Sequence, residues 1–128
     1  MLLPYVPESL TDFSLAHEQA AFRAALDKVA ADLGRAYPLV INGEQVAPGA
    51  AFPSVNPSRP AQIIGQFADG NASHAADAIS AATAAFDGWR KTPVAERARY
   101  LLHAAAEIRR RKHEFSAMMG YEVGKSWA

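Results

Sequence analysis

The stretch Leu39-Val40-Ile41-Asn42-Gly43-Glu44-Gln45-Val46 has the clearest local structural signal in the sequence. Asn42-Gly43 tolerates the positive φ angles of a type I′ turn, and the residues on both sides suit short strands, so the stretch predicts a two-residue β-hairpin. Two further apolar runs follow at 52–56 and 63–67, and a proline-containing turn at 57–60 separates them. Together these runs predict a small antiparallel β-meander.

A long helix is predicted before the hairpin. Ser14 is placed to cap this helix, Gly34 is placed to end it, and the apolar residues between them fall on one helical face. The members of that face are Leu15, Phe22, Leu26, Val29 and Leu33. Such a stripe indicates core packing and not a ligand site. Residues 1–13 are expected to form an extended arm in front of a folded region that covers residues 14–128.

Two amphipathic helices are predicted after the meander. The first is expected to begin at a Ser73 cap and to end near Arg90 or Lys91. Thr92-Pro93 then restarts the chain, as a cap followed by proline at the first position of the next helix. The two apolar stripes are Ile79, Ala82, Phe86 and Trp89, and then Leu101, Ala105, Ile108, Phe115 and Met119. The order of long helix, meander and two helices predicts an α/β fold.

Composition narrows the possible functions. The formal net charge is zero, so the sequence points to neither an acidic nor a basic partner. Alanine supplies 28 of the 128 residues, and Leu, Ile, Val and Phe together supply only 27, so the capacity for apolar burial is modest. We therefore expect the helices to pack against a larger body. The N-terminus lacks the pattern of a signal peptide and no apolar stretch is long enough for a bilayer, which favours a cytoplasmic location.

Residues that often carry chemistry give little support for a catalytic or metal site. Cysteine is absent, which excludes a disulfide, a thiolate metal site and a cysteine nucleophile within these 128 residues. The basic run Arg109-Arg110-Arg111-Lys112 spreads around most of a helix and is expected to be a solvated, ion-paired segment and not a nucleic-acid site. The histidines lack the spacing of metal ligands, so no metal site is predicted; they are His17, His74, His103 and His113.

The segment Gly124-Lys125-Ser126 has only a superficial likeness to the end of a phosphate-binding loop. The first glycine of that motif would fall at Met119, so the spacing fails. The glycines at 120 and 124 are expected to end one helix and to allow another to begin at Ser126-Trp127. Asn56-Pro57 indicates a side chain that closes a turn before a proline. We assign no catalytic, cofactor-binding or metal-binding residue to this chain.

Taken in order along the chain, the sequence blocks resemble the N-terminal part of the aldehyde dehydrogenase superfamily. The resemblance covers about Leu15 to Ala128. The chain resembles most the glutamate-γ-semialdehyde branch, the pyrroline-carboxylate dehydrogenases of proline breakdown. The leading helix and the basic tail are the features that favour this branch over other aldehyde dehydrogenases. The blocks that carry the resemblance are Val40-Ile41-Asn42-Gly43-Glu44, Ser54-Val55-Asn56-Pro57, Glu96-Arg97, Arg110-Arg111-Lys112-His113-Glu114 and Glu122-Val123-Gly124-Lys125.

The resemblance implies an NAD-dependent oxidation of L-glutamate γ-semialdehyde to L-glutamate. In that family a cysteine thiolate attacks the aldehyde, hydride passes to the nicotinamide, and a glutamate activates the water that releases the product. The family's nucleophile, base, oxyanion asparagine and nucleotide-loop residues find no counterpart here, so the isolated chain is expected to be inactive. The complete enzyme is expected to act on a small aldehyde as a homo-oligomer, with no nucleic-acid or membrane partner.

Two hypotheses remain open. In the first, the chain is the N-terminal segment of such a dehydrogenase and wraps the nucleotide-binding core with its helices and meander. In the second, it is a non-catalytic helical module that binds a protein or a nucleic acid. The coding sequence beyond Ala128 distinguishes the two, because the first predicts a nucleotide-binding fold and a catalytic cysteine there.

Overall fold

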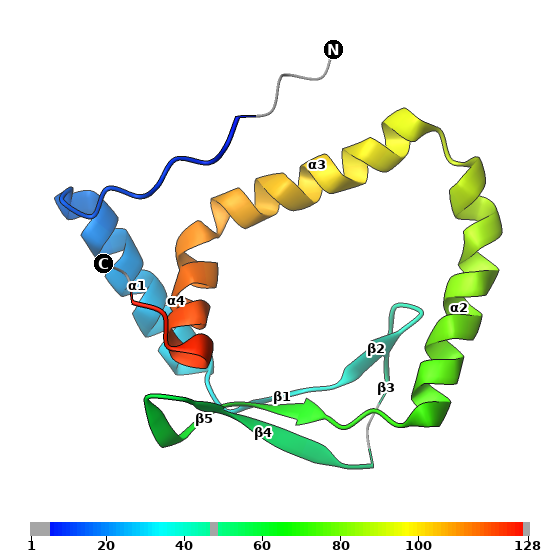
Figure 1. The fold of residues 1–128 in the computed structure, drawn as a ribbon, viewed down its shortest axis with the longest axis horizontal. Helices are drawn as coiled ribbons and strands as arrows, with labels where there is room; N and C mark the ends of the chain where they lie inside the picture. Colours follow the sequence, from blue (N-terminus) through cyan, green and yellow to red (C-terminus); the bar gives the residue numbers. More distant parts are fainter. Residues whose placement is uncertain (1–5, 47–48, 127–128) are drawn as a thin grey trace.

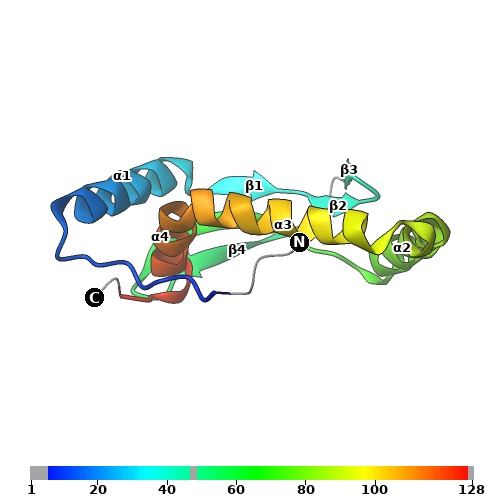
Figure 2. The ribbon, with the colours of Figure 1, turned by 90° about the horizontal axis from the view of Figure 1, so that it is seen from above.

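A computed structural model describes residues 6–46 and 49–126. Figure 1 shows an open arc, in which α1 and α4 pack together, the strands lie beside them, and α2 and α3 extend around the far side. Seen from above, the molecule is flat and elongated, with α1 and α2 at opposite ends (Figure 2). The elements are α1 Ala16–Asp32, β1 Arg35–Tyr37, β2 Leu39–Ile41, β3 Glu44–Val46, β4 Ala51–Asn56, β5 Arg59–Ala68, α2 Ala72–Lys91, α3 Val94–Arg110 and α4 Lys112–Val123.

The predicted hairpin is confirmed. β2 pairs antiparallel with β3, and Ile41 lies opposite Glu44 across the turn. Asn42 and Gly43 both have positive φ, at 53° and 79°, as a type I′ turn requires. The local turn chemistry therefore fixes the register of this hairpin.

The predicted antiparallel meander is confirmed only in part: two of the strand pairings are antiparallel, but the strands form two sheets and a third pairing is parallel. The hairpin stands apart as a two-stranded sheet, and the other sheet has the order β1-β5-β4. β4 and β5 are antiparallel, as expected, but β1 pairs parallel with β5. The turn between β4 and β5 is also shorter than predicted, because β5 already begins at Arg59.

β1 was not predicted, because contacts with residues distant in the sequence define this strand. Gly34 has φ of 81° and ends the helical region, as predicted, and its N–H donates to the Ile64 carbonyl at 2.9 Å. The Tyr37 ring stacks on Phe67 with centroids 4.9 Å apart, and a Cβ added at Gly65 would lie only 2.7 Å from Tyr37 Cε2. Pro38 follows at once and has no N–H to donate, which separates β1 from the hairpin.

The core lies between α1 and α4. Its buried members are Phe22, Ala25, Val29 and Ala117, and partly buried side chains surround them, including Leu26 and Leu33. The predicted leading helix and most of its apolar stripe are thus confirmed, but Leu15 is exposed. The Ser14 cap is wrong: α1 begins after Leu15 with no side-chain cap, because the Ser14 N–H donates to Asp12 Oδ1 at 2.9 Å in a preceding turn. Of the predicted arm, residues 6–12 contain no helix or strand, and residues 1–5 lie outside the described residues.

The caps of the next two helices also differ from the predictions. Asn71, not Ser73, caps α2: its Oδ1 accepts from the backbone N–H groups of Ser73 and His74 at 3.0 and 3.1 Å. The His74 ring accepts from the Asn71 N–H, which completes a capping box. Thr92 belongs to the end of α2, as its hydroxyl donates to the Gly88 carbonyl, and Pro93 is the N-cap of α3 and not its first residue. The predicted end of α2 at Lys91 is confirmed.

The predicted third helix is divided in two at Arg111. This residue has φ −107° and ψ 20°, and it caps both the end of α3 and the start of α4. The change of direction allows α4 to pack on α1, where Ala117 is fully buried and Glu114 pairs with Lys28 at 2.6 Å. The packing partner therefore explains the break, since the local sequence contains neither glycine nor proline.

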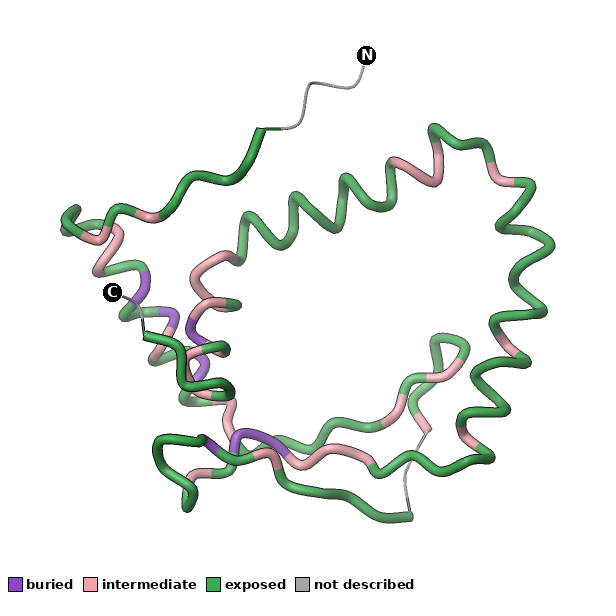
Figure 3. The backbone as a smooth tube through the Cα atoms, viewed as in Figure 1, coloured by how far each residue is buried: buried purple, intermediate pink, exposed green. Residues whose placement is uncertain are grey.

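The apolar stripes of the later helices are exposed in this chain, as expected for helices that pack against a larger body. Among the described residues, α2 and α3 contain no buried residue, and Figure 3 shows them exposed along most of their length. The large apolar members of these stripes are 40% to 74% exposed; they are Ile79, Phe86, Trp89, Leu101, Ile108, Phe115 and Met119. The amphipathic spacing is present, but no described element covers these faces.

Candidate functional site

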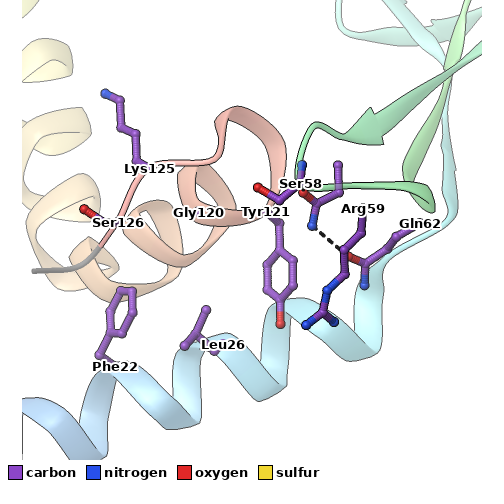
Figure 4. A pocket seen from close by; sticks show the side chains of 10 residues that line it. Phe22, Leu26, Ser58, Arg59, Gln62, Gly120, Tyr121, Lys125 and Ser126 are labelled. Carbon is purple, nitrogen blue, oxygen red and sulfur yellow. Dashed lines mark hydrogen bonds between the residues drawn. The ribbon is translucent and has the colours of Figure 1, made fainter.

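A cleft of about 330 Å³ lies where α1, α4 and the β4–β5 turn meet. Phe22 and Leu26 of α1 supply apolar lining, and Tyr121 of α4 points toward α1, whereas Lys125 points away from this floor (Figure 4). Polar lining comes from Asn56, Ser58, Arg59, Gln62, Lys125 and Ser126. None of the described lining residues carries a thiol, a carboxylate or an imidazole, so the cleft offers hydroxyl groups, hydrogen bonds and cations but no cysteine nucleophile.

Asn56 organises the turn beside this cleft. It is only 6% exposed, its Nδ2 donates to Gln62 Oε1 at 2.8 Å, and its Oδ1 accepts from the Ser58 N–H at 2.9 Å. These bonds satisfy both ends of a buried amide and close the turn at Pro57. The structural interpretation of Asn56-Pro57 is confirmed.

The glycine-lysine step after α4 is a helix end. Gly124 has φ of 67° and caps α4 in the left-handed conformation, as predicted. A Cβ added there would lie 3.3 Å from Pro57 Cγ, so the small residue also permits close approach to the β4–β5 turn. Gly120, by contrast, lies inside α4 and ends no helix. Ser126 lies in no helix, and the remainder of the helix predicted to begin at Ser126-Trp127 falls outside the described residues.

The basic run is ion-paired, which confirms that prediction. Arg109 Nε donates to Glu8 Oε2 at 2.7 Å, and this hydrogen bond raises the pKa of the arginine. Arg110 Nη2 donates to Glu107 at 2.6 Å, which raises the pKa of Arg110 and lowers that of Glu107. Arg111 Nη2 lies 3.0 Å from a carboxylate oxygen of Glu114, and Lys112 Nζ lies 3.7 Å from one of Glu18. Four cations that already face carboxylates on several sides do not form the single basic face that nucleic acid requires.

Two of the four histidines have structural partners. His113 Nε2 lies 2.9 Å from Glu18 Oε2, which links α4 to α1, and His74 belongs to the α2 capping box. His17 is exposed and lies 3.7 Å from Glu18. Within residues 6–46 and 49–126, no group of three His, Asp or Glu side chains is arranged to hold a metal ion. In the same part of the chain, no helix combines the length and apolar character needed to cross a membrane.

One cluster was missed by the sequence analysis. Trp89 at the end of α2 lies against Tyr100 and Arg97 of α3, with ring centroids 5.9 Å apart and the guanidinium carbon 6.0 Å from the indole centroid. The signal in the sequence was the three-residue step from Arg97 to Tyr100 just after the helix junction, which places both side chains on one face.

Comparison with known proteins places the chain in a protein family. The aldehyde dehydrogenase family matches residues 45–128. The chain is 47% identical over 127 residues to 1-pyrroline-5-carboxylate dehydrogenase 2 of Halalkalibacterium halodurans, and 46% identical over 127 residues to the enzyme of that name from Bacillus subtilis. Each match covers 99% of this chain and 25% of the relative, so the chain spans a quarter of their length.

Solved structures agree in fold. The chain superposes on Thermus 1-pyrroline-5-carboxylate dehydrogenase with bound NAD at a TM-score of 0.95 and 40% identity, covering 98% of this chain and 24% of that one. Proline utilization A from Bdellovibrio bacteriovorus gives a TM-score of 0.94 at 30% identity, with 98% of this chain and 13% of the other covered. The predicted fold, the N-terminal portion of an aldehyde dehydrogenase, is confirmed. The chain belongs to the aldehyde dehydrogenase family.

Proposed function

We propose that the chain is the N-terminal segment of an NAD-dependent dehydrogenase that oxidises L-glutamate γ-semialdehyde to L-glutamate in proline degradation. The observation that carries the proposal is the TM-score of 0.95 over 98% of the chain with the N-terminal quarter of an NAD-bound pyrroline-carboxylate dehydrogenase. The names of the most similar relatives point to the same substrate. A homo-oligomeric, cytoplasmic enzyme is part of the same proposal.

Within that enzyme we assign the segment a scaffolding role. Its clefts contain no thiol, and the whole sequence contains no cysteine, so the thiolate that attacks the aldehyde belongs to another part of the enzyme. We propose that no catalytic, cofactor-binding or metal-binding residue lies in these 128 residues. The ion pairing of the basic run argues against a nucleic-acid module, and the exposed apolar faces of α2 and α3 suit contact with the remaining enzyme.

The test compares two proteins. The polypeptide encoded through the region beyond Ala128 is purified and assayed with NAD and pyrroline-carboxylate, and NADH formation is followed by absorbance at about 340 nm. We expect turnover from the complete polypeptide and none from residues 1–128 alone, because only the former supplies a thiol. Turnover by the rigorously purified 128-residue chain, or preference of the complete enzyme for an unrelated aldehyde, would overturn the proposal.

A further inference from the structure

The turn of the β2–β3 hairpin presents two groups that can react with each other, the side-chain amide of Asn42 and the backbone nitrogen of Gly43. Both residues are exposed, and a Cβ added at Gly43 would meet nothing within 4 Å. Neither the Asn42 side chain nor the Gly43 N–H has a hydrogen-bond partner among the described residues. No hydrogen bond within the described chain therefore competes with a reaction between these groups.

The hairpin that carries this turn is weakly constrained. β2 and β3 have three residues each and, among the described strands, pair only with one another in a sheet of their own. A two-stranded hairpin is marginally stable by itself, and local opening of such a segment costs little free energy. Glycine also adopts most backbone conformations. The turn can therefore leave its native φ angles and bring the Asn42 side chain over the Gly43 nitrogen.

The two other asparagines of the sequence lack this combination. Asn56 precedes a proline, whose nitrogen carries no hydrogen, and both ends of its buried amide are hydrogen-bonded. Asn71 precedes an alanine, and its Oδ1 accepts from two backbone N–H groups and from the Ser73 hydroxyl. Asn42 is thus the one asparagine of the three that joins an unbonded amide to a following glycine nitrogen.

We propose that Asn42 is a modification site, at which attack by the Gly43 nitrogen on the side-chain amide deamidates the residue to aspartate and isoaspartate. The Gly43 nitrogen gives up its proton and forms a bond to Asn42 Cγ, and the bond from Cγ to the amide nitrogen breaks, so ammonia leaves with that proton. Water then opens the cyclic imide. Opening at Cγ gives aspartate, and opening at the backbone carbonyl gives isoaspartate. The reaction uses no oxidant, reductant or cofactor.

Isoaspartate would alter the hairpin more than aspartate. It inserts a methylene group into the main chain at a turn whose φ angles of 53° and 79° place Ile41 opposite Glu44. β2 also lines a hollow together with the start of α2, through Leu39, Val40 and Ile41. Loss of the hairpin register would therefore loosen the contact between the hairpin and α2.

The test follows Asn42 by peptide mass spectrometry while the folded complete enzyme is incubated in mildly alkaline buffer at physiological temperature. Fragmentation that distinguishes aspartate from isoaspartate identifies the products, and Asn71 is the internal control. We expect the intact Asn42 peptide to be lost at least about tenfold faster than the intact Asn71 peptide, because the Asn71 amide must first break its hydrogen bonds. Enzyme unfolded in urea gives the rate for the same sequence without the hairpin.

Asn42→Gly is the matched variant, because glycine keeps the positive φ and removes the side-chain amide. After incubation, the Tm of the wild-type enzyme should fall in proportion to its isoaspartate content, and the Tm of Asn42→Gly should not change. Equal rates of loss at Asn42 and Asn71 in the folded enzyme, or loss at Asn42 only in urea, would overturn the proposal. An unchanged Tm in wild-type enzyme rich in isoaspartate would overturn the effect on the hairpin. The mass measurement uses the wild-type enzyme and no activity assay, so its outcome is separate from that of the proposed reaction.

Discussion

Truncation of Phe22 to alanine should detach α1 from α4. Phe22 is 4% exposed, its ring meets Phe13 edge-on at 5.4 Å and His113 at 6.1 Å, and it lies in the same buried cluster as Ala117. Removal of a buried phenyl group costs about 3–5 kcal/mol when the site cannot collapse. Three polar contacts cross the same interface, Lys28–Glu114, Lys112–Glu18 and His113–Glu18, but their side chains are partly exposed and contribute less than the ring. The apolar contact should therefore dominate the stability of this helix pair.

Hydrogen exchange of the α1 amides in the complete enzyme measures this stability locally. Each 1.4 kcal/mol changes the equilibrium constant for local opening tenfold. We therefore expect the exchange rate of the α1 amides to rise by on the order of a hundredfold or more in Phe22→Ala. Leu10→Ala is the control, because Leu10 lies outside the buried α1–α4 cluster and its truncation should leave the exchange of the α1 amides nearly unchanged. If the α1 amides exchange at the same rate in Phe22→Ala as in Leu10→Ala, the assigned α1–α4 core is wrong.

Three further predictions concern caps, acid and the exposed stripe. Asn71→Ala should destabilise by about 1 kcal/mol and Ser73→Ala by less, in thermal melts, because Asn71 Oδ1 accepts both amide bonds; the reverse order would restore Ser73 as the cap. The hydrogen bond from Lys28, followed by that from a neighbouring arginine, lowers the pKa of Glu114 below the ordinary 4.5, so the stabilising contribution is present above pH 4.5 and is lost as pH falls through the lowered value. Melts from pH 6 to pH 3 should show that loss, and Lys28→Met should reduce the dependence on pH; an identical acid profile in that variant would contradict it. Leu101→Ala in the complete enzyme should cost about 2–5 kcal/mol with unchanged Michaelis constants, because the side chain, 74% exposed here, is expected to be covered there; altered substrate affinity in a stable variant would place α3 at the active site instead.

Features encoded within a few residues were predicted correctly. The turn at Asn42-Gly43 is determined by these two residues alone, and Asn56-Pro57 likewise determines the β4–β5 turn. The caps were harder, because Asn71 and Ser73 both offer oxygens near the start of α2 and only the three-dimensional geometry selects Asn71. That these 128 residues contain no catalytic residue remains a prediction. The lining of the cleft supports it, and only an assay of the complete enzyme tests it.

Features that depend on distant residues were not predictable from local pattern. β1 is three residues long and is defined by its pairing with β5, thirty residues later. The break at Arg111 follows from the contact of α4 with α1, and no neighbouring glycine or proline indicates it in the sequence. Periodicity correctly identified apolar faces on α2 and α3 but carries no information about which part of a protein covers them.

The pairing of α1 with α4 has a consequence for synthesis on the ribosome. The ion pair between Lys28 and Glu114 joins residues 86 apart, and Glu18 and His113 are 95 apart, with the sheet and two helices between them. At roughly 5–20 residues per second, α1 is complete about 4–16 s before the synthesis of α4 begins. During that interval Phe22 and Val29 have no α4 to pack against. The first helix made is thus the one that waits for the last helix of this segment, and its apolar face stays open to non-native contacts during that interval.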